Sequence, residues 1–300
     1  MKILITGGAG FIGSNLAEEF VKKGDVIVVD NLHSGSLENL KIIKEKIKFV
    51  KADCKNILNL SLPKVDFIFH CGIYSSSPMY KANPFLVGDA INGSIAVFEF
   101  AKRSDARVIF ASSSSLYSGL KPPHREDMIP QVNDYYTEAR YCIERLAELY
   151  NKLYGVKSIG LRLFSVYGPH EEYKGKYANC LTQMILNDSF VIYGNGEQTR
   201  DFIYVSDVVK AFSLAMEKCE GFKIYNVGTG KETSFNQIAK LIKKYKPLKI
   251  SYEPNPIKNY VERTCADISL AKKELGFKAE VRLEEGIKRT LEYYKALKLE

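Results

Sequence analysis

The sequence predicts an α/β protein built on a doubly wound parallel sheet, with a smaller α/β region towards its C-terminal end. Short apolar runs rich in β-branched residues alternate with helix-like stretches through residues 1–170. This alternation is typical of a parallel sheet that helices cover on both faces. A glycine-rich turn follows the first apolar run, and the alternation becomes irregular after residue 170. We therefore expect one domain over 1–170 and a second region mainly over 171–300, with the chain able to cross between them.

The first element is a strand, Lys2–Thr6, followed by a glycine turn and a helix-like stretch, Ser14–Lys23. A turn of this kind presents the free N–H groups of a helix N-terminus to a diphosphate. Gly7 permits the tight turn, and Gly10 lets the backbone approach the phosphates. Gly13 lets the helix pack closely on the strand. The strand, turn and helix together are the context that a dinucleotide site requires.

The second strand, Asp25–Asp30, ends in a carboxylate 23 residues after Gly7. A carboxylate at this place accepts hydrogen bonds from the adenosine ribose hydroxyls and repels a 2′-phosphate, so the expected cofactor is NAD. A structural turn with an incidental Asp30 is the alternative. Further candidate cofactor contacts lie in the turns after the first four strands, namely Phe11, Ile12, Asn31, Ser34, Gly35, Cys54, Cys71, Gly72 and Ile73.

Two more strands follow a lysine-rich amphipathic segment, Ser36–Lys46. The third strand, Ile47–Asp53, ends at a carboxylate that either hydrogen-bonds the adenine amino group or caps the next helical segment; both interpretations stay open. The fourth strand, Val65–His70, ends in a histidine with no acid near it in sequence, so we assign His70 a structural role.

The second half of the sheet carries the candidate catalytic groups. The fifth strand, Arg107–Ser112, runs into a serine cluster at its carboxyl end, where open parallel sheets bind ligands. On the later helix Asp134–Tyr154, Tyr136 and Arg140 stand four residues apart and therefore share one face. The other expected elements are the helix Phe85–Arg103, the strand Ser158–Val166, the short strands Phe190–Tyr193, Lys223–Val227 and Leu248–Tyr252, and the helices Tyr177–Asn187, Ser206–Cys219, Ser234–Tyr245 and Leu283–Leu297.

Composition excludes several classes of protein. The chain is 46% hydrophobic and 26% charged, as in ordinary globular proteins. It has no apolar run of about 18 residues and begins with a strand, so we expect no membrane helix, no signal peptide and a cytoplasmic location. The six scattered cysteines form no Cys-x-x-Cys pair, which argues against a metal site. The net charge of +8 comes without a basic block interleaved with aromatic residues, so nucleic acid is not an expected partner.

The glycine turn, Asp30, the serine cluster and Tyr-x-x-x-Arg together resemble the extended short-chain dehydrogenase/reductase family, NAD-dependent nucleotide-sugar epimerases and dehydratases, and most of all its UDP-glucose 4-epimerase group. Four later stretches are also similar to family motifs: Leu161–Pro169, Gly194–Val205, Tyr225–Gly230 and Ala266–Ser269. The resemblance implies a Rossmann-type NAD domain over 1–170, a nucleotide-sugar-binding region mainly over 171–300, and a homodimer.

The resemblance also implies roles for individual residues. Tyr136 matches the family's base, Arg140 the cation that supports it and reaches the nicotinamide ribose, and Ser113 the hydroxyl that bonds the reacting oxygen. A free phenol has a pKa near 10, so such a base needs a cation beside it. Phe164 joins the cofactor contacts, and the implied substrate contacts are Ser75, Ser113, Ser114, Ser165, Tyr193, Arg200 and Thr264.

Each of these roles has a plainer alternative. Tyr136 could be a core aromatic residue, Arg140 could pair with Glu144 one helical turn on, and Arg200 could pair with Asp201 rather than hold the substrate diphosphate. The chain also departs from the family, with Arg140 in place of lysine and Ser165 in place of asparagine.

The resemblance implies one reaction more than others. Family dehydratases carry Asp-Glu directly after the catalytic hydroxyl, and decarboxylases carry Glu in the second of these places, where this chain has Ser114 and Ser115. The expected function is therefore a UDP-hexose 4-epimerase that works through a transient 4-keto sugar. The small Thr264 leaves room for N-acetylhexosamines. The alternative is a nucleotide-sugar-binding or sensing protein of the same fold with little or no turnover.

Overall fold

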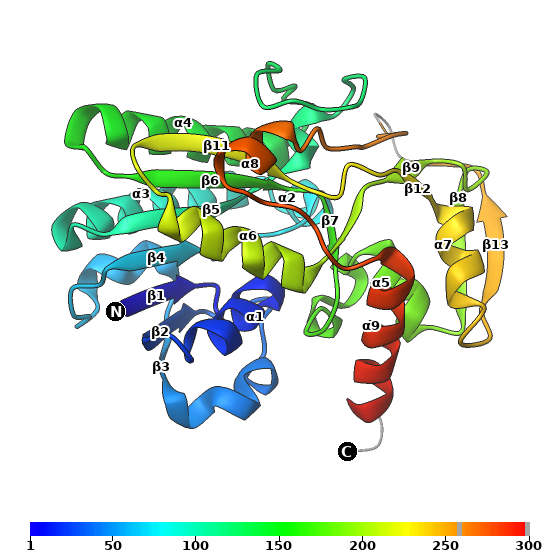
Figure 1. Cartoon of the computed structure of the whole chain (residues 1–300), viewed down its shortest axis with the longest axis horizontal. Coiled ribbons are helices and arrows are strands. Elements are labelled where there is room, and N and C mark those ends of the chain that lie inside the picture. Colours follow the sequence, from blue (N-terminus) through cyan, green and yellow to red (C-terminus); the bar gives the residue numbers. More distant parts are fainter. Residues whose placement is uncertain (257–259, 298–300) are drawn as a thin grey trace.

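The computed structural model describes residues 1–256 and 260–297. Its central feature is a seven-stranded sheet in the order β11-β6-β5-β4-β1-β2-β3 (Figure 1). Every neighbouring pair of strands is parallel, which confirms the predicted doubly wound sheet. The strands are β1 (Lys2–Thr6), β2 (Asp25–Asp30), β3 (Ile47–Lys51), β4 (Phe67–His70), β5 (Arg107–Ser113), β6 (Ser158–Leu163) and β11 (Phe222–Val227).

Helices cover both faces of this sheet because side chains alternate along each strand. Ile3 and Ile5 of β1 face a core shared with α1 and α6, whereas Leu4 faces a core shared with α3 and α4. Figure 1 shows α1 and α6 side by side over one face. These helices are α1 (Phe11–Phe20), α3 (Leu86–Ser104), α4 (Tyr135–Tyr154) and α6 (Val205–Glu217). Further helical segments are η1 (Leu37–Lys46), η2 (Cys54–Asn59), α2 (Ser77–Ala82), η3 (Ser114–Tyr117) and α8 (Ser269–Glu274).

The expected strand Ser158–Val166 is wrong in its second half. The sheet strand β6 ends at Leu163, and β7 (Ser165–Tyr167) pairs with β10 (Phe202–Tyr204) outside the large sheet. The partner changes at this point: the Phe164 amide still donates to Val227, the last residue of β11, and the Ser165 amide donates to Asp201. The chain leaves the sheet where its neighbouring strand ends.

The remaining elements pack around a third, smaller core. Strands β8 (Ser189–Tyr193) and β13 (Lys249–Glu253) pair there. Figure 1 shows them with the helices α5, α7 and α9 to one side of the large sheet. The helices are α5 (Cys180–Leu186), α7 (Phe235–Ile242) and α9 (Leu283–Leu297); β9 (Thr199–Arg200), β12 (Thr233–Ser234) and η4 (Glu172–Tyr177) connect them. Because β11 belongs to the large sheet and α6 packs on it, the part of the chain after residue 170 contributes both to the large sheet and to the smaller core.

Two further properties concern residues 1–256 and 260–297. No helix in these ranges combines the length and the apolar character needed to span a membrane, and no cluster of His, Cys, Asp and Glu side chains there could bind a metal ion. All six cysteines lie within these ranges as free thiols.

Candidate cofactor and active site

The glycine turn forms a cradle that tolerates no side chain. Gly7 has φ +68°, and a Cβ on it would lie 2.7 Å from the backbone of Cys71 and Gly72. A Cβ on Gly13 would lie 2.2 Å from the Gly7 carbonyl oxygen. The first backbone bond within α1 runs from the Ser14 amide to Gly10 at 2.9 Å, so the preceding amides have no partner within the helix. Free amides and the helix dipole together suit an anion such as a diphosphate.

The helix α1 begins at Phe11, three residues before the expected Ser14, and ends at Phe20. The helix starts this early because Gly10, in an extended conformation, serves as its N-cap without a side chain. The amides that have no partner within the helix are therefore those of Phe11, Ile12 and Gly13, inside the glycine turn itself.

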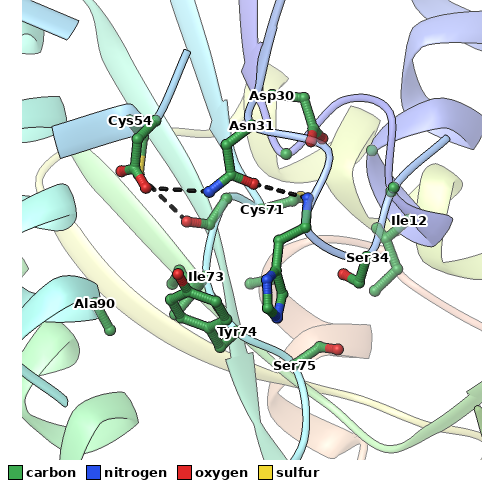
Figure 2. Close-up of a pocket in the computed structure, with 18 of the residues that line it drawn as sticks. Ile12, Asp30, Asn31, Ser34, Cys54, Cys71, Ile73, Tyr74, Ser75 and Ala90 are labelled. Atoms are coloured by element: carbon green, nitrogen blue, oxygen red, sulfur yellow. Dashed lines mark hydrogen bonds between the residues drawn. The ribbon is translucent and has the colours of Figure 1, made fainter. Parts of the chain in front are cut away.

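A pocket opens at the carboxyl edge of the sheet, beside this turn. Figure 2 shows Ile12, Asn31 and Tyr74, from the segments that follow three different strands, around it. It contains every candidate cofactor contact except Tyr136 and Phe164. The lining residues are Gly7, Gly10, Phe11, Ile12, Gly13, Val29, Asp30, Asn31, His33, Ser34, Gly35, Ala52, Asp53, Cys54, Cys71, Gly72, Ile73, Tyr74, Ser75, Asp89, Ala90, Ala111, Arg140 and Lys174.

Two carboxylates from neighbouring strand ends line the pocket. Asp30 is buried and accepts the Ala9 amide at 2.9 Å and the Leu32 amide at 2.7 Å. Burial raises the pKa of Asp30, and these backbone bonds oppose the rise. Asp53 accepts the Lys55 amide at 3.0 Å and so caps η2, which confirms the capping interpretation. Its other oxygen accepts the Asn31 side-chain amide at 3.0 Å, and its contact with adenine stays a prediction.

Tyr136 and Arg140 lie together on the buried face of α4. This helix is fixed at its start by a capping box between Asp134 and Thr137. Tyr136 is 8% exposed, whereas its neighbour Tyr135 is 51% exposed. The Arg140 guanidinium carbon lies 5.0 Å from the centre of the Tyr136 ring. This is a cation–π contact between two buried side chains on one helix face.

Arg140 does not pair with Glu144. Its Nη1 donates to the Ala111 carbonyl at 2.7 Å and its Nη2 to the Tyr74 carbonyl at 3.2 Å. The buried Nε of Arg140 has no hydrogen-bond partner among the described residues. Arg140 thus bridges the end of β5 and the loop after β4, at the wall of the pocket.

Glu144 is instead the centre of a buried network that joins α4 to the sheet. It accepts Arg162 Nε at 2.9 Å and Nη2 at 2.7 Å, and Ser112 Oγ at 2.6 Å. Ser113, the next residue, is buried at the end of β5, and its Oγ accepts the Ser115 amide at 3.1 Å. The described contacts show no acceptor for the Ser113 hydroxyl proton, which can therefore be donated to a ligand.

The structure does not bring all substrate candidates to the pocket. Ser75 lines it. The candidates that do not line it are Ser113 (at the end of β5), Ser114 (in η3), Ser165 (in β7), Tyr193 (at the end of β8), Arg200 and Thr264. The Thr264 hydroxyl is buried and has no partner within the described part of the chain. Phe164 is buried against Tyr117 and Ala266 rather than in the pocket.

The proposed ion pair of Arg200 with Asp201 is absent from the described contacts. Asp201 is fully buried and accepts the amides of Thr229, Gly230 and Ala266. The Arg200 guanidinium carbon lies 5.5 Å from the Phe235 ring centre and 5.4 Å from that of Tyr260. Its Nη1 also donates to the carbonyls of Thr199 at 2.7 Å and Glu262 at 3.3 Å, and no carboxylate of the described residues pairs with it.

His70 has the structural role expected of it. Its Nδ1 lies 2.7 Å from Thr6 Oγ1 and its Nε2 3.0 Å from Ser94 Oγ. Burial lowers the pKa of His70 to about 3, so the ring is neutral near pH 7.

Sequence reasoning missed seven lining residues: Val29, His33, Ala52, Asp89, Ala90, Ala111 and Lys174. Val29, His33 and Ala52 adjoin predicted contacts and could have been found from the strand ends, whereas Asp89 and Ala90 lie in α3 and Ala111 lies in β5. Lys174 could not have been found in this way, because it lies in η4, more than 160 residues after the glycine turn, in a stretch that carries no motif.

These residues fit a dinucleotide. The glycine cradle and free amides suit a diphosphate, and Asp30 offers a carboxylate at the end of the next strand. Carboxylates and cations both line the pocket, as a ligand with neutral sugars and a charged diphosphate requires.

Comparison with known proteins gives the same picture. A UDP-glucuronic acid decarboxylase 1 of Arabidopsis thaliana is 32% identical over 96% of this chain and 68% of its own length. A solved UDP-glucose 4-epimerase with UDP-glucose from Thermotoga maritima is 34% identical, covers 100% of both chains and has a TM-score of 0.90. The solved protein MoeE5, in complex with UDP-glucose and NAD, is 28% identical over 99% of both chains, with a TM-score of 0.86.

A family match completes these findings. Residues 3–228, which include the glycine turn, Asp30, Tyr136 and Arg140, match the NAD dependent epimerase/dehydratase family. The chain belongs to this family of enzymes, and its cofactor is NAD.

Proposed function

We propose that this enzyme is a UDP-hexose 4-epimerase that interconverts UDP-glucose and UDP-galactose through a transient 4-keto sugar. The observation that carries the proposal is the pairing of Tyr136 with the buried guanidinium of Arg140, 5.0 Å from its ring centre, at the wall of the NAD pocket. A proton acceptor held against a fixed cation is what reversible oxidation of a sugar alcohol needs.

Each candidate residue has a separate role in the proposed reaction. NAD, when bound, supplies the acceptor and donor of hydride. Tyr136, as a phenolate that the charge of Arg140 stabilises, takes the proton of the sugar 4-hydroxyl and becomes a neutral phenol. Ser113 donates its free hydroxyl proton to the reacting oxygen. Arg200 holds the substrate diphosphate, for which a guanidinium is suited.

The residues after the catalytic hydroxyl support epimerisation over elimination or decarboxylation. Ser114 and Ser115 carry hydroxyls, which at neutral pH serve poorly as the general acids or bases that loss of water would require. This difference matters because one of the similar proteins is a UDP-glucuronic acid decarboxylase.

A substrate panel tests the proposal. Purified protein receives UDP-galactose, UDP-N-acetylgalactosamine or UDP-glucuronate without added reductant, and products are identified by NMR and mass spectrometry. We expect UDP-glucose from the first and, because Thr264 is small, the 4-epimer of the second. Release of CO₂ from UDP-glucuronate without epimerisation of the other two would overturn the proposal. Binding of all three without turnover would favour the sensing protein.

We also propose that the enzyme acts as a homodimer through its long helices. Leu149, Leu153 and Tyr154 of α4 expose much of their apolar surface. Light scattering after gel filtration is expected to give twice the chain mass of 33.9 kDa.

A further inference from the structure

One lysine that lines the NAD pocket, Lys174, comes from a segment far from the glycine turn. Among the described residues that line the pocket, Asp30, Asp53 and Asp89 are carboxylates, and Arg140 and Lys174 are the strong bases. Asp89 is balanced by the exposed Lys55 at 3.1 Å. Arg140 is already bonded to two carbonyls. Lys174 is thus the lining base whose task is unexplained.

Lys174 reaches the start of α1 from a distant segment. It lies in η4, between β7 and α5, and its Nζ is 5.7 Å from the centre of the Phe11 ring. Phe11 is the first residue of α1, where the backbone amides have no helical partner. An ammonium here therefore stands beside the part of the turn that suits an anion.

A buried carboxylate fixes this ammonium in place. Glu171 is 1% exposed, and its Oε1 accepts Lys174 Nζ at 2.9 Å and the Asn179 amide at 2.9 Å. Its Oε2 accepts Thr182 Oγ1 at 2.6 Å. Glu171 is therefore anchored to α5 and its cap, and it orients the lysine rather than following it.

The ammonium has bonding capacity to spare. A lysine ammonium carries three N–H donors, and the Lys174 ammonium bonds only Glu171 among the described residues. Its side chain is only 16% exposed, so little water can satisfy the other donors. Leaving a partly desolvated cation under-bonded is costly unless a ligand completes its shell.

We propose that Lys174 is a phosphate-binding residue of the NAD site. Its ammonium bonds the cofactor diphosphate, while the amides at the start of α1 bind the same group from the glycine turn. Cofactor retention then depends on η4 as well as on the nucleotide-binding core. The inference rests on the cofactor of the family and not on the sugar that the enzyme turns over.

Two diphosphates could reach this ammonium, that of NAD and that of the sugar nucleotide. Calorimetric titration of the full-length protein with NAD, ADP, adenosine and UDP separates them. The variant is Lys174→Met, and the matched control is Lys176→Met, which removes an exposed lysine of the same segment that does not line the pocket.

For Lys174→Met we expect NAD and ADP to bind about tenfold more weakly, the low end of what a hydrogen bond to a charged group contributes. Adenosine and UDP should bind as in the wild type, and Lys176→Met should change nothing. Wild-type affinity for NAD should also fall more steeply with salt than that of Lys174→Met.

Unchanged NAD affinity in Lys174→Met overturns the proposal, as does a loss that falls on UDP alone. An equal loss for adenosine and NAD also overturns it, since it would mark general damage to the pocket. Lys174→Arg, which keeps the charge, guards against a folding artefact and should retain most of the NAD affinity.

Discussion

At the scale of single residues, Arg140 is the clearest departure from the family pattern. Its planar fork spans two carbonyls, Ala111 on β5 and Tyr74 after β4, which a compact lysine ammonium could not match with the same geometry. The same side chain lies against Tyr136. One arginine thus forms a structural bridge and also supplies the charge that we propose for catalysis.

Replacing Arg140 separates these two tasks. Arg140→Lys keeps the charge and should preserve or raise the rate. Arg140→Met removes both the charge beside Tyr136 and the bonds to the two carbonyls, so the rate should fall across the whole pH range. The measurement is the rate of epimerisation from pH 6 to 10 together with bound NAD. An unchanged profile and NAD content in Arg140→Met would remove Arg140 from the catalytic site.

At the scale of elements, the glycine turn and α1 form one unit. The glycine spacing predicted the turn, because both positions require glycine. Gly7 has a positive φ, and a Cβ on Gly13 would collide with the Gly7 carbonyl oxygen. The same spacing placed the start of α1 too late, because Gly13 was taken as the end of the turn when it lies inside the first helical turn. The strand break at Phe164 was also missed, since it depends on where β11 ends and not on local sequence.

Two glycine-to-alanine variants test this unit. Gly13→Ala places a Cβ 2.2 Å from the Gly7 carbonyl, so we expect a loss of about 1–3 kcal/mol in unfolding free energy and weaker NAD binding. Gly88→Ala, in α3, meets nothing within 4 Å and should stabilise by about 0.5–1 kcal/mol. Urea unfolding and NAD titration measure both. Equal stability for the two variants would refute the close approach at Gly13.

At the scale of the whole molecule, the parallel sheet was predictable and its long-range assembly was not. The first five strands follow from local apolar runs, and their carboxyl ends define the pocket. That β11 closes the sheet beside β6, and that Lys174 reaches Phe11, depends on contacts between segments far apart in sequence. For the same reason the alternative that paired Arg140 with Glu144 was wrong, because the fold gives Glu144 to Arg162.

The buried His70 links global stability to pH. Burial lowers the pKa of His70 in the folded protein to about 3. As the pH falls below about 6.5, the unfolded chain therefore becomes protonated at His70 while the folded chain stays neutral there. The contribution of neutral His70 to the free energy of unfolding is full above about pH 6.5. It is lost as the pH falls towards 3, by up to about 1.4 kcal/mol per pH unit. His70→Gln lacks this proton, so the stability advantage of the wild type in urea should shrink from pH 7 to pH 5. A constant difference, or a charged His70 by NMR at pH 5, would contradict this.

The most direct test of the central proposal combines one substrate with two tyrosine variants. Purified protein receives UDP-galactose with no added nucleotide or reductant, and formation of UDP-glucose is followed by NMR. We predict turnover in the wild type and in Tyr135→Phe, whose ring is exposed. In Tyr136→Phe the rate should fall by about 10²–10⁴-fold, with UDP-sugar binding largely kept. An active Tyr136→Phe, or a wild type that holds NAD and UDP-galactose without forming UDP-glucose, would contradict it.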